Sequence, residues 1–157
     1  MLAWLYDEDR YPSGAAGGYV TKNPAYRAKY LVFSPEKVEF YAREEAIAQG
    51  KPYLLACYDI VLNTDGTLKS GKIIEESDVP DGCKWYAYVR TPEPNGWFNN
   101  QTYSDTMSKA AVDEFIGITY EAYKDSVGEQ FGKTVPAIFT DEPHTLEKTT
   151  LAFANEK

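Results

Sequence analysis

The chain has 157 residues and a formal net charge of −8, and 43% of its residues are hydrophobic. This size and apolar content suit one folded domain with a core. Lysine and arginine are nowhere clustered, so the electrostatic basis for binding DNA or RNA is missing and we expect no nucleic-acid partner. The first residues lack the basic and apolar regions of a secretion signal, and no apolar run reaches the roughly 18 residues of a membrane span. We therefore expect a soluble protein without membrane contact, cytoplasmic as given, and leave export of a parent protein open.

Apolar and aromatic runs bounded by turn residues predict β-strands along much of the chain. The turn sequence Asn63-Thr64-Asp65-Gly66 joins two of these runs and predicts an antiparallel hairpin over about 52–76. The strands expected in chain order are 2–6, 28–33, 52–62, 68–75, 84–90 and 135–139.

Three helices are expected between and after these strands. Ser34, Pro35 and Glu36 have the character of an N-cap and first turn, which predicts a helix to about Gln49, ended by Gly50, although Val38–Tyr41 could also be extended. A second helix is predicted for 107–131, and a third for 146–155. The second has apolar positions at three- and four-residue spacing on one face: Val112, Phe115, Ile116, Thr119, Tyr123 and Val127.

The order strand, helix, strand over 84–139 predicts a right-handed parallel crossover. We therefore expect an α/β fold, a partial (β/α)8 TIM-type barrel over 1–157 that carries the hairpin as an insertion. A complete barrel needs roughly 200 residues or more, so only part of one fits this length. Because a partial barrel exposes strand edges and apolar surface, we also expect a homo-oligomer that covers them.

Two of the expected strands end in acidic residues, at Asp7-Glu8-Asp9 and at Asp141-Glu142. In a parallel barrel both ends lie on one rim, so these carboxylates would converge. Hydrolysis of a glycoside needs two such groups, one to protonate the leaving oxygen and one to act as nucleophile or to activate water. A partly desolvated strand-end Glu142 suits the acid role, and the following Pro143 restricts it to extended geometry.

Other interpretations of these residues remain open. Either acidic cluster also fits a solvated loop or the first turn of a helix. Bound Ca²⁺ is a further alternative, but the alternating ligand spacing of a calcium loop is missing, and we expect no cofactor. His144 could hydrogen-bond a substrate hydroxyl, with a surface or capping role as the favoured alternative. Cys57 and Cys83 lack metal or disulfide spacing and are expected to be buried apolar residues.

Three segments resemble the catalytic barrel of large bacterial glycoside hydrolases, including proteins similar to the family 106 α-L-rhamnosidases. They are LYDEDRYPSGAAGG, NGWFNNQTYSDTMSKAAVDEFI and GKTVPAIFTDEP. FTDEP is similar to the Asn-Glu-Pro signature of retaining barrel glycosidases, which implies that Glu142 is the general acid/base. Asp141 then stands where an Asn would contact the sugar 2-hydroxyl, so an inverting mechanism stays open.

The same resemblance implies further sugar-contacting residues, and a later strand would hold the partner carboxylate, which has no counterpart in this chain. The sugar-contacting residues are Asp7, Glu8, Trp97, Tyr103 and Asp105. The function expected is hydrolysis of O-glycosyl bonds in a carbohydrate substrate by a strand-end carboxylate. The alternative is a non-catalytic carbohydrate-binding or assembly module derived from such a barrel.

Overall fold

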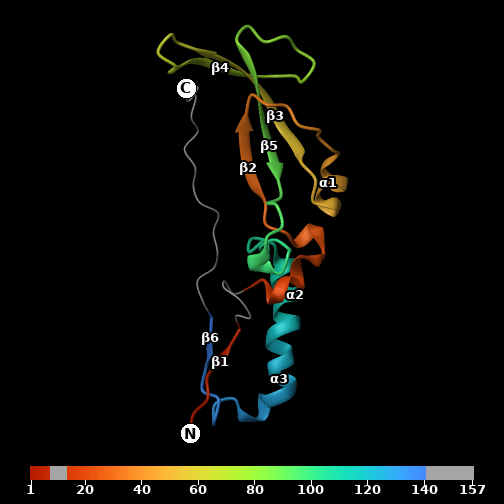
Figure 1. Cartoon of the computed structure of the whole chain (residues 1–157), viewed down its shortest axis with the longest axis vertical. Coiled ribbons are helices and arrows are strands. Elements are labelled where there is room, and N and C mark those ends of the chain that lie inside the picture. Colours follow the sequence, from red (N-terminus) through yellow and green to blue (C-terminus); the bar gives the residue numbers. More distant parts are fainter. Residues whose placement is uncertain (8–13, 141–157) are drawn as a thin grey trace. The chain divides into compact units, whose positions relative to one another are not determined.

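The computed structural model describes residues 1–7 and 14–140, which form two compact units. Unit 1 contains the described residues up to Ala28 and from Pro92 to Thr140. Unit 2 contains Lys29–Thr91, a continuous stretch inserted between the two parts of unit 1. Each unit has its own strands and its own buried residues, and the two are described separately below (Figure 1).

Unit 2 is built on a four-stranded antiparallel sheet with the strand order β2-β5-β3-β4. Its strands are β2 (Tyr30–Ser34), β3 (Tyr53–Leu62), β4 (Leu68–Ile74) and β5 (Cys83–Arg90). The hairpin predicted for 52–76 is confirmed as β3 and β4, whose register pairs Cys57 with Ile74 and Leu62 with Leu68. The turn between them includes Gly66, which has a φ of 83°.

One face of this sheet carries the core of unit 2. Cys57, Tyr86 and Tyr88 are buried there, and the register places Cys57 beside Tyr86. The chain after β2 covers them, and the ring of Phe40 lies 5.8 Å from that of Tyr86 and 5.3 Å from that of Tyr88. A short helix, α1 (Arg43–Gln49), follows and ends at Gly50, which has a φ of 68°.

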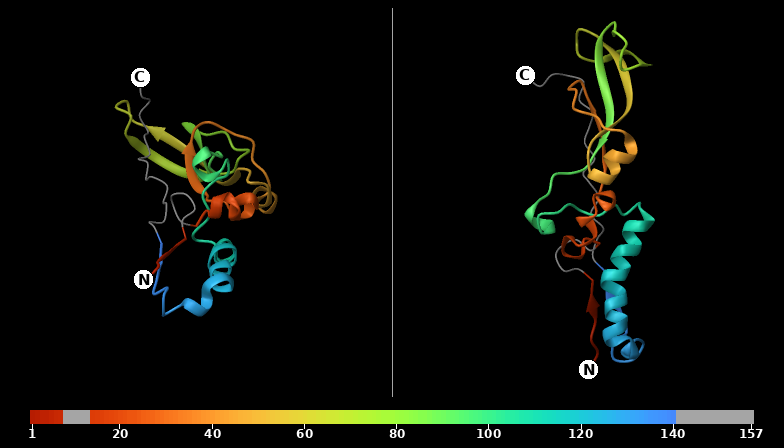
Figure 2. Two further views of the ribbon diagram at one scale, coloured as in Figure 1. Left: turned by 60° about the horizontal axis from the view of Figure 1, so that its bottom comes forward. Right: turned by 90° about the vertical axis from the view of Figure 1, so that its right-hand side faces the viewer.

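Unit 1 combines one parallel strand pair with a long helical segment. The strands are β1 (Leu5–Tyr6) and β6 (Ile138–Phe139), which pair in parallel. Figure 2 shows the helical segment as one continuous run. It consists of α2 (Lys109–Phe115), η5 (Ile116–Glu121), α3 (Ala122–Val127) and η6 (Gly128–Gln130). Four short 3-10 turns complete the unit: η1 (Ala16–Gly18), η2 (Val20–Lys22), η3 (Pro24–Tyr26) and η4 (Gly96–Phe98).

The helical segment contains an uncommon π-helix, η5, between two α-helices. In a regular α-helix, residues five apart differ in direction by about 140°. The rings of Phe115 and Tyr120 nevertheless meet edge to face, with centroids 5.7 Å apart. The π-turn therefore brings Tyr120 onto a side of the helix that Phe115 also occupies.

The prediction of a partial TIM-type barrel is wrong. The strand predicted at 84–90 is β5, an inner strand of the antiparallel sheet, and the parallel partner of β6 is β1. Short connections such as the turn at Gly66 join neighbouring strands antiparallel, whereas a barrel needs a crossover helix after each strand.

Two local predictions are also wrong. The helix expected from Ser34 begins only at Arg43, although Ser34 Oγ accepts a hydrogen bond from Glu36 N, 3.0 Å away, as an N-cap would. Cys57 is buried as expected, but Cys83 is exposed at the start of β5. Within residues 1–7 and 14–140, no helix is both long enough and apolar enough to cross a membrane.

Candidate functional site at the β1–β6 edge

The parallel pairing of β1 and β6 brings the ends of both strands to the same edge. Leu5 is opposite Ile138 and Tyr6 is opposite Phe139, and the rings of the second pair stack with centroids 5.1 Å apart. The pairing continues one residue further, where Asp7 N donates to Phe139 O at 3.2 Å. Asp7 and Thr140 are thus the first residues beyond the paired strands.

The Asp7 carboxylate is the centre of this edge. Asp7 is only 3% exposed, and its Oδ2 accepts hydrogen bonds from the hydroxyls of Tyr120 and Thr140. Burial disfavours the phenolate, and the hydrogen bond to Asp7 holds the phenolic proton, so the pKa of Tyr120 is raised. The cluster joins residues from three distant parts of the sequence.

A second tyrosine of the same helical segment also contacts β1. The hydroxyl of Tyr123 donates to the backbone oxygen of Tyr6, next to Asp7. Residues three apart lie on neighbouring positions of a helix face, so Tyr120 and Tyr123 meet successive residues of the strand. The helical segment therefore runs antiparallel to β1 and is tied to it by two phenols.

The other described candidates lie in the loop before α2 and have different surroundings. Trp97 is 60% exposed in η4, where its backbone N donates to Asn95 Oδ1 at 2.9 Å. Tyr103 is 4% exposed and packs on Phe98, with ring centroids 5.6 Å apart. Asp105 Oδ1 accepts from the backbone N of Met107 at 3.1 Å, just before α2.

These contacts give Tyr103 a place in the core and Asp105 a place in a turn, while the Trp97 ring is open to solvent. That any of the three contacts a sugar stays a prediction. The remaining candidates lie outside the described residues, so their distances from Asp7 are not defined. They are Glu8, Asp141, Glu142 and His144.

Sequence reasoning missed Tyr120 and Thr140, the two residues that bind Asp7. The face predicted for the 107–131 helix assumed the α-helical period throughout, and it therefore omitted Tyr120. One signal was present: Tyr120 and Tyr123 repeat an amphipathic side chain at three-residue spacing, as expected of a helix face that packs on a strand.

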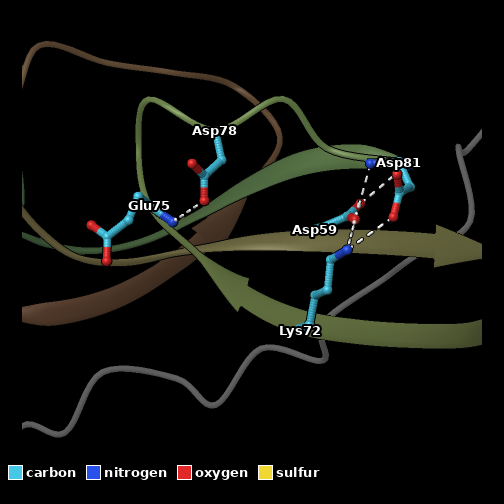
Figure 3. Close-up of polar contacts among 6 residues, drawn as sticks. Asp59, Lys72, Glu75, Asp78 and Asp81 are labelled. Atoms are coloured by element: carbon cyan, nitrogen blue, oxygen red, sulfur yellow. Dashed lines mark hydrogen bonds and ion pairs between the residues drawn. The ribbon is translucent and has the colours of Figure 1, made fainter.

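Unit 2 contains a second buried carboxylate, Asp59 on β3, which is 2% exposed (Figure 3). Its two oxygens accept hydrogen bonds from Gly82 N at 2.8 Å and Asp81 N at 3.0 Å. Lys72 Nζ lies 3.4 Å from Asp59 Oδ2 and 2.9 Å from Asp81 Oδ2. These groups, first the Gly82 amide, lower the pKa of Asp59, although its burial acts in the opposite direction.

This arrangement has a structural role. The Asp59 carboxylate holds the end of the connection between β4 and β5, and Glu75 N donates to Asp78 Oδ2 at 3.0 Å near its start (Figure 3). In the described part of the chain, no three His, Cys, Asp or Glu side chains are grouped so that they could hold a metal ion. The open calcium alternative involves acidic residues that mostly lie outside this part.

No protein-family model, curated protein or solved structure matches the chain, so the resemblance to glycoside hydrolases stays a prediction.

Proposed function

We propose that the chain acts on glycosides, with Glu142 as the general acid/base at the β1–β6 edge. The observation that supports this proposal is the parallel register of β1 and β6. Parallel strands end at the same edge, and in the sequence acidic residues follow both β1 and β6.

The proposed chemistry needs no cofactor. The protonated Glu142 gives its proton to the leaving glycosidic oxygen as the bond to the sugar carbon breaks, and a water molecule attacks that carbon and gives up one proton, which restores the acid for the next turnover. Glu8 and Asp141 would accept hydrogen bonds from sugar hydroxyls. The exposed ring of Trp97 would offer an apolar surface to one face of a sugar.

The test is turnover of a panel of aryl glycosides by the wild-type chain and by Glu142→Gln. The substitution keeps the shape of the side chain and removes its acidic proton, so kcat should fall by about 10²–10⁴-fold. Glu129→Gln is the matched control, because it makes the same change at an exposed residue of η6 and should leave kcat unchanged. Turnover that survives Glu142→Gln would remove Glu142 from the mechanism.

A second candidate is sugar binding without turnover. Two observations favour this candidate. Oδ2 of Asp7 is already occupied by two hydroxyls of the chain itself. Trp97, in contrast, is exposed. Calorimetric titration with the sugars of the same panel separates the two candidates. Binding that is lost in Trp97→Ala, without turnover by the wild type, would support the binding function over the catalytic one.

A further inference from the structure

We propose that the exposed face of the β1–β6 strand pair is an interface that binds the same face of a second copy of the chain. This face carries the side chains of Leu2, Trp4, Tyr6 and Phe139, and we call it the outer face. The proposal concerns the assembly of the chain and does not depend on the catalytic function proposed above.

The outer face exists because side chains alternate across a strand. Leu2, Trp4 and Tyr6 are two residues apart in the sequence, so they share one side of β1. The register places Phe139 beside Tyr6, and their rings stack with centroids 5.1 Å apart. The exposed fraction is 65% at Trp4 and 45% at Tyr6 but only 3% at Asp7, which points to the opposite side. The largest apolar side chains of β1 therefore face away from the helical segment.

The helical segment covers the opposite face of the strand pair. Tyr120 donates to Asp7 there, and Tyr123 donates to the backbone oxygen of Tyr6. Parallel strands are almost always covered on both faces, and a pair of strands without a second covering layer is marginally stable in water. Within residues 1–7 and 14–140, the four side chains of the outer face keep 44–69% of their surface exposed. A second layer on this face would give the pair the cover that parallel strands require.

The chemistry of the outer face favours a partner that is itself apolar. Its side chains carry no charge, and their polar groups are limited to the Tyr6 hydroxyl and the Trp4 indole N–H. A sugar needs several polar groups that converge on it, so this face is a poor sugar site. The centres of protein interfaces are depleted of charge and enriched in aromatic residues. The chain has a net charge of −8, and because none of this charge lies on the outer face, two copies can meet there.

The exposed apolar area is close to what a dimer needs. At about 150–250 Å² for each whole aromatic side chain, the exposed fractions of the three rings, together with Leu2, amount to roughly 350–500 Å². A specific interface buries about 800 Å² per partner, of which about 56–65%, or roughly 450–520 Å², is apolar. The outer face alone therefore supplies most of the apolar part of such an interface.

Contact of the outer face with itself also completes both strand pairs at once. In a two-fold dimer the same patch is buried on both copies, so one set of residues is sufficient for both sides. The two strand pairs would pack face to face about 10 Å apart, and each helical segment would lie on the outside. Both faces of each parallel pair are then covered, which a small ligand on one ring would not achieve.

The first test is the mass of the full chain by sedimentation equilibrium, from about 1 to about 100 µM, since interfaces of this size have Kd values from micromolar downward. We expect a concentration-dependent dimer with twice the 17.7 kDa of the chain. Trp4→Glu should raise Kd at least about 30-fold, because it places a charge at the centre of the interface. Trp97→Glu is the matched control, since it makes the same change at a 60% exposed tryptophan of the same unit, and it should leave Kd unchanged. A wild type that stays monomeric, or equal weakening by both variants, would overturn the proposal.

A second measurement locates the interface without a disruptive variant. Trp97→Phe leaves Trp4 as the one strongly exposed tryptophan, since Trp85 is only 8% exposed. Acrylamide quenching of this variant should weaken as the protein concentration rises through Kd, because the second copy covers Trp4. A dimer whose Trp4 is quenched as strongly as that of the monomer would place the contact elsewhere and refute the proposal. Protection of Trp4 by a glycoside in a chain that stays monomeric would make the face a sugar site instead, and would also refute it.

Discussion

Replacing Gly82 by alanine should destabilise unit 2 through a backbone clash that the structure makes explicit. An ideal Cβ at Gly82 would lie 2.3 Å from the backbone oxygen of Ile60 and 2.9 Å from its carbonyl carbon. A shift of about 1 Å would relieve the overlap but would stretch the 2.8 Å bond from Gly82 N to Asp59 beyond hydrogen-bond length. Either response costs stability, since the atoms in the way belong to the main chain of β3.

The free energy of unfolding should fall by about 3 kcal/mol, the upper end of the range for overpacking. For a unit of this size, this corresponds to a Tm lower by about 12–24 °C. Gly71→Ala is the matched control, because its Cβ would meet the same residue, Ile60, only at the side-chain tip Cδ1, 3.1 Å away. That tip can move, so the loss should stay below about 1 kcal/mol.

Thermal and urea unfolding of the full chain measures both variants. Substituting Trp4 and Trp97 by phenylalanine leaves Trp85 on β5 as the sole tryptophan, so its fluorescence reports on unit 2. If Gly82→Ala loses no more stability than Gly71→Ala, the reasoning from the Ile60 backbone is wrong.

The remaining predictions concern a titrating group and a pair of neighbouring aromatic residues. Because the folded pKa of Asp59 is lowered, its contribution to stability is present above the unfolded value of about 3.9 and is lost as the pH falls through the folded pKa. The Tm difference between wild type and Asp59→Asn should therefore be largest near neutral pH and shrink below about pH 4, and a pH-independent difference would contradict this. Phe98→Ala should cost about 3–5 kcal/mol because Phe98 is buried against Tyr103, whereas Trp97→Ala should change the free energy of unfolding by no more than about 0.5 kcal/mol. Urea unfolding distinguishes the two, and equal losses would refute this assignment of core and surface.

The hairpin at 52–76 could be predicted because its signals are local. Two β-like runs and the Asn63–Gly66 turn between them indicate β3 and β4 within a stretch of sequence that folds on itself. The strand at 84–90 was also predicted correctly, but the two strands that pair with it, β2 and β3, were not predicted to do so. The residue pattern of a strand does not specify its partner strands. The partners are what distinguish the antiparallel sheet that is observed from the barrel that was predicted.

The candidate site could be predicted only in part for the same reason. Asp7 was recognised from its position after an apolar run, and β1 and β6 were both recognised as strands. Their parallel pairing brings their ends to one edge, as expected, although no barrel closes around them. Tyr120 was missed because a π-turn has no local sequence pattern and the α-helical period does not hold across it.

The insertion of unit 2 between the two parts of unit 1 also fixes the order in which the protein can assemble during synthesis. Domains generally fold as units as they leave the ribosome, and Lys29–Thr91 is complete while β1 still lacks its partner. Leu5 can pair only after Ile138 has been synthesised, and Asp7 can accept its two hydrogen bonds only after Tyr120 and Thr140 have been synthesised. The β1–β6 edge is thus the last part of the described structure to form, and a nascent chain arrested before Ile138 would contain all of Lys29–Thr91 but no such edge.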